Sequence, residues 1–246
     1  MKLLFENWRK FLKESANDVS GVIQAEEELI VQLLSTSKTF ELHWNGGVDP
    51  ETGEEILGMK NSLEGTAHHH GETSAQHTLN VVDAMDDIID EYKDELDDAA
   101  QKKYKLLAAL HDIGKGITRG VDPETEKVSF RGHASRGAEL AEKILDEYED
   151  LNESDRITMK KLVKMHMQVL FMINKIAAGE KIKPKPLERF ATKAGDEMET
   201  LLRFTKANLK ALIDPADAPN VSGREWESFK GGVEASIKEV DQLKLD

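Results

Sequence analysis

The adjacent residues His111 and Asp112 place two metal-ligand side chains together at the end of an apolar helical pattern. Leu107 and Ala108 share a helical face with His111, and Gly114 predicts a left-handed residue that stops the helix. Neutral imidazole suits transition metals and carboxylate suits harder cations, so this pair could bind a divalent ion. A His-Asp dipeptide alone is a weak signal, and its assignment depends on further ligands elsewhere in the chain.

Three further histidines are predicted to face the interior or a helix end. His77 lies in the first turn of a helix that Thr73 and Gln76 begin with a capping-box pattern. His133 opens another predicted helix, and His166 has apolar neighbours at helical spacing. Taken singly, an inward histidine is more often a satisfied core residue than a ligand. Because buried polar groups need partners, one metal would satisfy several of these side chains at once.

The elements that carry these histidines are predicted to be almost entirely helical. From about residue 74 onward, apolar periodicity predicts helices over 74–92, 97–113, 134–149, 154–178, 186–194, 197–213 and 223–243. The last of these is expected to pack as a C-terminal helix.

The first 65 residues are predicted to be mixed. Amphipathic patterns predict helices over 2–14 and 21–36. Phe40 to Trp44 alternates like a strand, and residues 55–57 could return as its hairpin partner after the turn at 49–53. A similar Asp-Pro-Glu-Thr stretch at 122–125 is interpreted as the same turn chemistry rather than a repeated domain.

Composition excludes several classes of protein. The chain has 246 residues and no cysteine, which rules out disulfides, thiolate metal sites and thiol nucleophiles. A formal net charge of −14 argues against broad, sequence-independent nucleic-acid binding, since such binding needs Lys and Arg to neutralise phosphate. No apolar run approaches the roughly 20 residues of a membrane span, so we expect a cytoplasmic protein without a membrane partner.

Five segments join the histidines into one ordered pattern. They are His70-(six residues)-His77-Thr78-Leu79, the run from Leu107 to Lys115, Gly132-His133-(three residues)-Gly137-Ala138, Met165-His166-Met167, and Phe190-(four residues)-Gly195 with Leu201-Leu202. From about residue 66 to 212, this pattern resembles HD-domain metal-dependent phosphohydrolases. It is most similar to the HD domain of the tRNA nucleotidyltransferase and poly(A) polymerase family. The Gly-Gly and carboxylate pair of a nucleotidyltransferase core is not found.

The resemblance implies a mainly α fold, an HD-domain-like helical bundle with a small β-hairpin near residues 39–58. It divides the chain into an N-terminal extension of helices and hairpin (1–65), an HD domain (66–213), and a linker with a packed C-terminal helix (214–246).

The resemblance also implies a metal site. His77, His111 and Asp112 would be ligands of a divalent ion (Mn, Ni, Co, Fe, Mg or Zn), which the family completes with an aspartate late in the chain. Here that position falls at Asn208, which could bind through its neutral carbonyl oxygen at the cost of one negative charge. Asp196 is a possible substitute, but it fits a helix N-cap better.

Further roles follow from the same resemblance. Asp112 would also accept the proton of an activated water, and Lys115 could contact phosphate or simply complement a helix C-terminus. His133 and His166 would bind a second metal or the phosphate, and His70 together with Lys115 would bind substrate.

We therefore expect an HD-superfamily phosphohydrolase, either a phosphomonoesterase or a phosphodiesterase. Its substrate would be small and phosphorylated: a nucleotide, a cyclic nucleotide or an RNA-end phosphate. One alternative is a catalytically impaired HD module that binds a nucleotide or a protein partner, for which Asn208 is the main sequence evidence. Another is a helical interaction protein whose histidines are only polar residues of the core.

Overall fold

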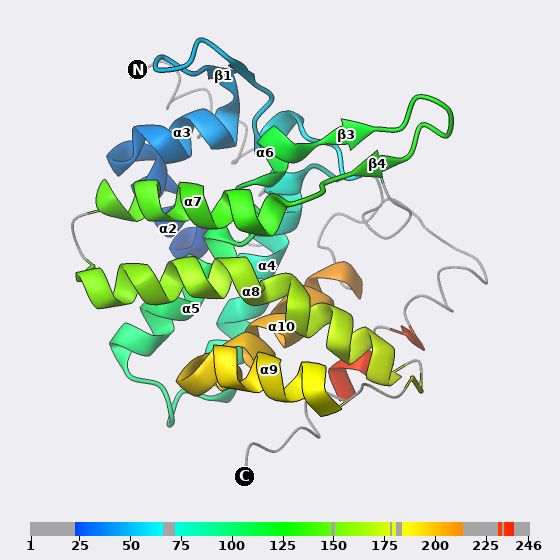
Figure 1. Cartoon of the computed structure of the whole chain (residues 1–246). Helices are drawn as coiled ribbons and strands as arrows, with labels where there is room; N and C mark the ends of the chain where they lie inside the picture. Colours follow the sequence, from blue (N-terminus) through cyan, green and yellow to red (C-terminus); the bar gives the residue numbers. More distant parts are fainter. Residues whose placement is uncertain are drawn as a thin grey trace.

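A computed structural model describes residues 23–65, 72–148, 151–177, 179–180, 184–213, 231–232 and 234–238, and these are mainly helical (Figure 1). The α-helices are α2 (Ile23–Thr36), α3 (Lys38–Asn45), α4 (Ser74–Glu91), α5 (Asp98–Leu110), α6 (Lys115–Thr118), α7 (His133–Asp146), α8 (Glu153–Ala177), α9 (Pro184–Ala194) and α10 (Met198–Ile213). Two short 3-10 helices, η1 (Met59–Asn61) and η2 (Gly195–Glu197), join them. The predicted helix over 2–14 lies outside the described residues.

The predicted mainly α fold is confirmed. Helices α4, α5, α7, α8, α9 and α10 occupy the ranges that apolar periodicity predicted, within four residues at each end. Residues 231–232 and 234–238 are helical within the predicted C-terminal helix. The short helix α6 was not predicted, because four residues carry too little periodicity to be recognised.

The predicted strand from Phe40 to Trp44 is wrong, because this segment forms helix α3. The hydroxyl of Ser37 caps the helix by accepting a hydrogen bond from the Phe40 amide at 2.9 Å. Phe40, His43 and Trp44 are then buried on one face, at the spacing of a helix rather than of a strand. Five residues are too few to separate the two periodicities.

A small hairpin does lie inside the predicted region 39–58, but with different strands. Strand β1 (Gly47–Val48) pairs antiparallel with β2 (Glu55–Ile56). A second hairpin pairs β3 (Gly120–Val121) with β4 (Val128–Ser129). In the two turns, the Oδ1 atoms of Asp49 and Asp122 each accept two backbone amides, which supports the interpretation that the similar stretches share turn chemistry.

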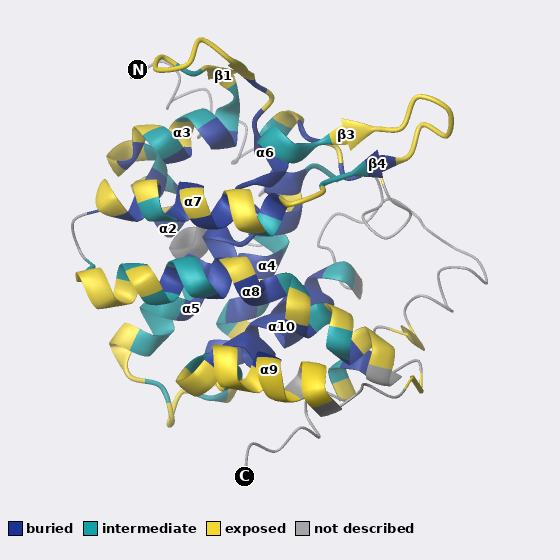
Figure 2. Cartoon of the chain, viewed as in Figure 1, coloured by how far each residue is buried: buried dark blue, intermediate teal, exposed yellow. Residues whose placement is uncertain are grey.

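The helices enclose one hydrophobic core. Helix α10 contacts α4, α5 and α8, and α7 packs along α8. Figure 2 shows buried residues gathered on the facing sides of these helices. Apolar residues of α2 and α3 belong to the same core, so the N-terminal segment packs directly on the later helices. None of the described helices is both long and apolar enough to cross a membrane. The domain limits expected at residues 65 and 213 stay predictions.

Gly114 does not adopt the predicted left-handed conformation. Its φ of −77° and ψ of −8° are right-handed, so the chain continues through a turn into α6. The glycine is needed for a different reason, since an added Cβ would overlap the carbonyl oxygen of His133 and lie 2.6 Å from the Gly137 amide nitrogen. The close approach at Gly114 brings the start of α7 against the residues that follow α5.

Candidate metal centre

The histidines and Asp112 come from four helices that meet in the interior. His77 lies in the first turn of α4, and His111 with Asp112 follows α5 directly. His133 is the first residue of α7, and His166 lies in the middle of α8. All five are buried, with at most 8% of any residue exposed. The sequence-predicted convergence is therefore present in three dimensions.

The ligand atoms form two groups that share the Asp112 carboxylate. Its Oδ2 atom lies 2.9 Å from Nε2 of His111 and 3.9 Å from Nε2 of His77. Its Oδ1 atom lies 3.3 Å from Nε2 of His133 and 3.6 Å from Nε2 of His166. Each carboxylate oxygen thus faces one pair of imidazoles, an arrangement suited to one ion or to two ions bridged by Asp112.

Three imidazole rings are oriented by the backbone carbonyl of the residue three positions earlier in the chain. Nδ1 of His111 lies 2.8 Å from the Ala108 oxygen, that of His133 lies 2.8 Å from the Phe130 oxygen, and that of His166 lies 2.7 Å from the Val163 oxygen. A neutral ring that donates from Nδ1 keeps a lone pair on Nε2. All three lone pairs then face Asp112, which is the orientation that metal-binding histidines require.

His77 is held differently, by side chains at both ring nitrogens. Its Nε2 atom lies 3.1 Å from Oδ1 of Asn208, a buried residue of α10. Its Nδ1 atom lies 3.3 Å from Oε1 of Glu72. Asn208 therefore lies beside the His77 group, where the sequence placed a fourth ligand. Asp196, the alternative, lies in η2 and is exposed.

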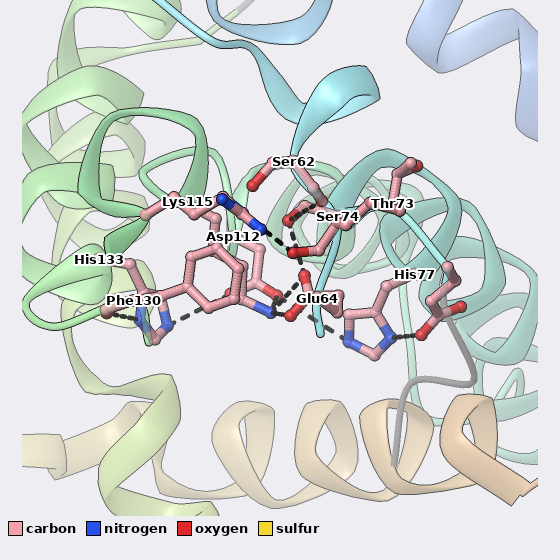
Figure 3. A network of polar contacts seen from close by, with 12 residues as sticks. Ser62, Glu64, Thr73, Ser74, His77, Asp112, Lys115, Phe130 and His133 are labelled. Carbon is pink, nitrogen blue, oxygen red and sulfur yellow. Dashed lines mark hydrogen bonds and ion pairs between the residues drawn. The ribbon is translucent and has the colours of Figure 1, made fainter. Parts of the chain in front are cut away.

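Lys115 lies between two buried carboxylates. Its Nζ atom is 2.8 Å from each carboxylate oxygen of Glu64 and 2.9 Å from Oδ2 of Asp112. The hydroxyl of Ser74 donates a further hydrogen bond of 2.6 Å to Glu64. Figure 3 shows Glu64, Lys115 and Asp112 together between His133 and His77. A phosphate contact by Lys115, which stays a prediction, would have to share or replace one of these ion pairs.

These contacts set the protonation of the centre. Burial alone would raise the pKa of the Asp112 carboxyl, but His111 and Lys115 beside it hold that pKa well below its usual range. Burial alone would lower the pKa of the Lys115 ammonium group, but Asp112 and Glu64 outweigh burial and raise it. Asp112 is therefore an anion and Lys115 a cation at neutral pH.

The pKa values of His133 and His166 are shifted in opposite directions. Burial lowers the pKa of His166 to about 3, although the charge of Asp112 opposes this. Burial also acts to lower the pKa of His133, but the hydrogen bond and charge of Asp112 outweigh it and raise that pKa. His166 is consequently neutral at pH 7 and available as a nitrogen ligand.

The donor chemistry fits a divalent cation. Nε2 of His111 is buried and forms no hydrogen bond with any described residue, although Asp112 Oδ2 is only 2.9 Å away. Their geometry is not that of a hydrogen bond, and both atoms could bind an ion at a common position. A buried polar atom of this kind needs a partner, and an ion at that position would supply one.

Comparison with known proteins agrees with this geometry. The family model described as HD domain matches residues 74–201, slightly more than half of the chain. The chain belongs to the HD domain family. A 42-residue stretch, 17% of the chain, is 48% identical to the CC-adding tRNA nucleotidyltransferase of Thermus thermophilus. That stretch spans 10% of the length of the relative.

Membership in the HD family confirms the resemblance expected from the sequence. The HD family is a superfamily of hydrolases whose members bind divalent metals, and the buried His/Asp groups of this HD domain fit that property. Within the described residues, the centre includes every predicted site residue: His77, His111, Asp112, Lys115, His133, His166 and Asn208. His70 lies outside the described residues.

Sequence reasoning missed two carboxylates of the centre, Glu64 and Glu72. Both lie before the HD match, in segments joined by an isolated antiparallel bridge between Leu63 and Thr73. The position of Glu72 next to the predicted N-cap Thr73 was a usable signal, because it puts a carboxylate at the start of the helix that carries His77. Glu64 had no local signal, since its partner Lys115 is 51 residues away.

Proposed function

We propose that this HD domain is a metal-dependent phosphohydrolase that acts on a nucleotide, a cyclic nucleotide or an RNA-end phosphate. The observation that carries the proposal is the shared Asp112 carboxylate, each oxygen of which faces a separate pair of histidines. When bound, a divalent ion supplies Lewis acidity toward phosphate oxygens and activation of a water molecule. RNA ends are included because the name of the partial relative refers to tRNA.

The residues of the centre would have different roles in this reaction. His77, His111, Asp112 and Asn208 would hold one ion, and His133 with His166 would hold a second ion or donate hydrogen bonds to phosphate. Asp112 would also accept a proton from an attacking water. Its low pKa keeps the carboxylate ionised but makes it a weak base, so this step would need a bound ion to lower the pKa of that water.

Lys115 contributes a fixed positive charge next to Asp112. Its protonation is maintained by Glu64 as well as Asp112, so the charge persists near neutral pH. A substrate phosphate that reaches the Lys115 ammonium group would meet a hydrogen-bond donor that Glu64 and Asp112 already hold in place. Less free energy is then spent on reorienting the protein during the reaction.

The experiment is a phosphate-release and product-mapping panel with protein purified without a His-affinity step. Substrates are nucleoside monophosphates, 2′,3′-cyclic nucleotides and a short RNA with a terminal phosphate, each with Mn, Ni, Co, Fe, Mg and Zn. We expect metal-dependent hydrolysis of at least one substrate, and a loss of at least 100-fold in His111→Gln. His43→Gln is the matched control, because His43 is a buried histidine of α3 outside the ligand groups.

A second candidate function is a binding module without hydrolysis. Two observations favour it: an amide, Asn208, stands in the ligand set, and Lys115 is already engaged by two carboxylates. For this candidate we expect the wild type to bind metal and nucleotide without turnover, and Asn208→Asp to create metal-dependent hydrolysis. Turnover by the wild type would exclude the binding module. Absence of bound metal, with no thermal stabilisation by added Mn, Ni or Co, would exclude both functions.

A further inference from the structure

The proposed ligands of the His77 group, taken from the described residues, carry little negative charge for a divalent ion. His77, His111 and Asn208 are neutral ligands, and Asp112 is the only carboxylate of the set. The Oδ2 atom of Asp112 that faces this group also lies 2.9 Å from the Lys115 ammonium group. A divalent cation here would gain from anionic support behind its neutral ligands.

Glu72 supplies a carboxylate directly behind one of these ligands. Its Oε1 atom lies 3.3 Å from Nδ1 of His77, on the side of the ring opposite Asn208. Its Oε2 atom accepts a 3.0 Å hydrogen bond from Nδ2 of Asn80, which lies about one turn after His77 on α4. The Glu72 side chain is 12% exposed, which limits screening of its charge by water. Figure 3 marks the contact at the outer side of the labelled His77 ring by a dashed line.

The backbone of Glu72 is fixed as well. Its carbonyl oxygen accepts a 3.1 Å hydrogen bond from the Glu64 amide, beside the bridge that pairs Leu63 with Thr73. The next residue, Thr73, is the N-cap of α4. Both the main chain and the carboxylate of Glu72 are therefore held in place relative to His77.

The four imidazoles of the centre differ in the group that lies next to their Nδ1 atoms. His111, His133 and His166 are each backed by a neutral backbone carbonyl. His77 is backed by a carboxylate, and it is also the ring that contacts the amide Asn208. The added negative charge thus lies at the one ring whose neighbouring ligand is an uncharged amide.

We propose that Glu72 is a positioning residue for His77 and supplies, through the imidazole ring, negative charge that Asn208 lacks. Its carboxylate favours the ring tautomer with the proton on Nδ1, which leaves the Nε2 lone pair facing Asp112 and Asn208 and makes that nitrogen a stronger donor. This inference rests on the proposed metal site.

The test is a metal titration of the full chain, with Mn or Co and a competing chelator, for wild type and Glu72→Gln. Glutamine keeps the size and one oxygen toward His77, and Asn80 can turn its amide oxygen toward the new NH2 group, so the main change is the loss of charge. We expect metal affinity to fall 10- to 100-fold, the usual effect of losing such an outer partner. The visible absorption spectrum of the Co-loaded protein should change as well. Glu91→Gln is the matched control, because Glu91 lies on the same helix but pairs with Lys206.

A double variant that moves the carboxylate from position 72 to position 208 tests directly whether Glu72 supplies the charge that Asn208 lacks. Adding Asn208→Asp to Glu72→Gln returns one carboxylate to the neighbourhood of His77, and we expect affinity within about threefold of wild type. A purely structural role for Glu72 predicts no such rescue.

The outcomes separate this inference from the function on which it rests. If the wild type binds metal and Glu72→Gln binds it equally well, the role of Glu72 is overturned and the metal site stands. If the wild type binds no metal, both are overturned. Should Glu72→Gln fail to fold, Asn80→Leu decides, since it releases Oε2 of Glu72 without altering a ligand. We then expect a several-fold loss of affinity, and unchanged affinity would refute the proposal.

Discussion

Nε2 of His133 and Nε2 of His166 lie 3.3 Å apart, although Nδ1 of each ring points at a backbone carbonyl. Two neutral rings held in this way would place two lone pairs against each other. The contact becomes favourable when a proton or a cation lies between the nitrogens. Because the pKa of His133 is raised and that of His166 is lowered to about 3, His133 is the ring that carries such a proton in the metal-free protein.

This contact predicts a second, separable metal position. We expect two divalent ions per chain in the wild type and one in His133→Asn, because the variant removes a nitrogen from the group of His133, His166 and Asp112 only. Metal content after dialysis, measured by elemental analysis, checks the ratio, with His43→Gln as control. A stoichiometry of one in both wild type and His133→Asn would refute a second position at this pair.

Lys115 is expected to contribute strongly to folding stability. Lys115→Met leaves Glu64 and Asp112 buried without their shared cation, which should lower the free energy of unfolding by about 3 to 5 kcal/mol. Urea denaturation of the metal-free protein measures the change. The control is Lys103→Met, because Lys103 pairs with Glu197 in a more exposed setting and should cost about 1 kcal/mol or less. Similar losses in both variants would contradict the buried network.

Gly114 should not tolerate a side chain. In Gly114→Ala the new Cβ would overlap the His133 carbonyl and push α7 away from the turn after α5. We expect a loss of about 1 to 3 kcal/mol in stability together with weaker metal binding, since His133 moves with α7. In Gly120→Ala the nearest atom is 3.7 Å from the new Cβ, so stability should change by about 0.5 kcal/mol or less. Normal metal binding in Gly114→Ala would argue against close packing at this position.

His43 should make the fold sensitive to acid. Burial lowers the pKa of His43 to about 4, with smaller effects of nearby charges, so the folded state favours the neutral ring. An unfolded chain binds the proton near pH 6.5, and stability is therefore full above that pH and lost as the pH falls toward 4.

The corresponding measurement compares wild type with His43→Gln by urea denaturation of the metal-free protein at pH 7, 6 and 5. We expect the wild type to lose about 2 kcal/mol more than the variant between pH 7 and 5. The comparison cancels the titration of His166, which both proteins share. Parallel pH profiles would show that His43 titrates normally in the folded state.

Much of this HD domain is encoded in local patterns. The periodicity of long helices such as α4 and α8 predicts their positions, because each repeats an apolar stripe over several turns. The ordered segments that carry His77, His111-Asp112, His133 and His166 resemble HD domains, and that resemblance predicts the family and a metal centre.

Other features depend on contacts between distant residues. The segment from Phe40 to Trp44 became a helix because its buried face and the Ser37 cap outweighed a five-residue alternation. Glycine is needed at position 114 because the His133 carbonyl approaches it closely, and no local pattern contains that contact.

The sequence by itself determined the helical class, which follows from repeated local spacing, and its resemblance to HD domains indicated which histidines converge. Only the tertiary structure decided which carboxylates contact the residues of the centre from outside. Glu64 reaches Lys115 across 51 residues, and Glu72 meets His77 because a β-bridge fixes its backbone beside α4. Burial gives such pairings their strength, because a carboxylate acts strongly on its neighbours only where water is excluded.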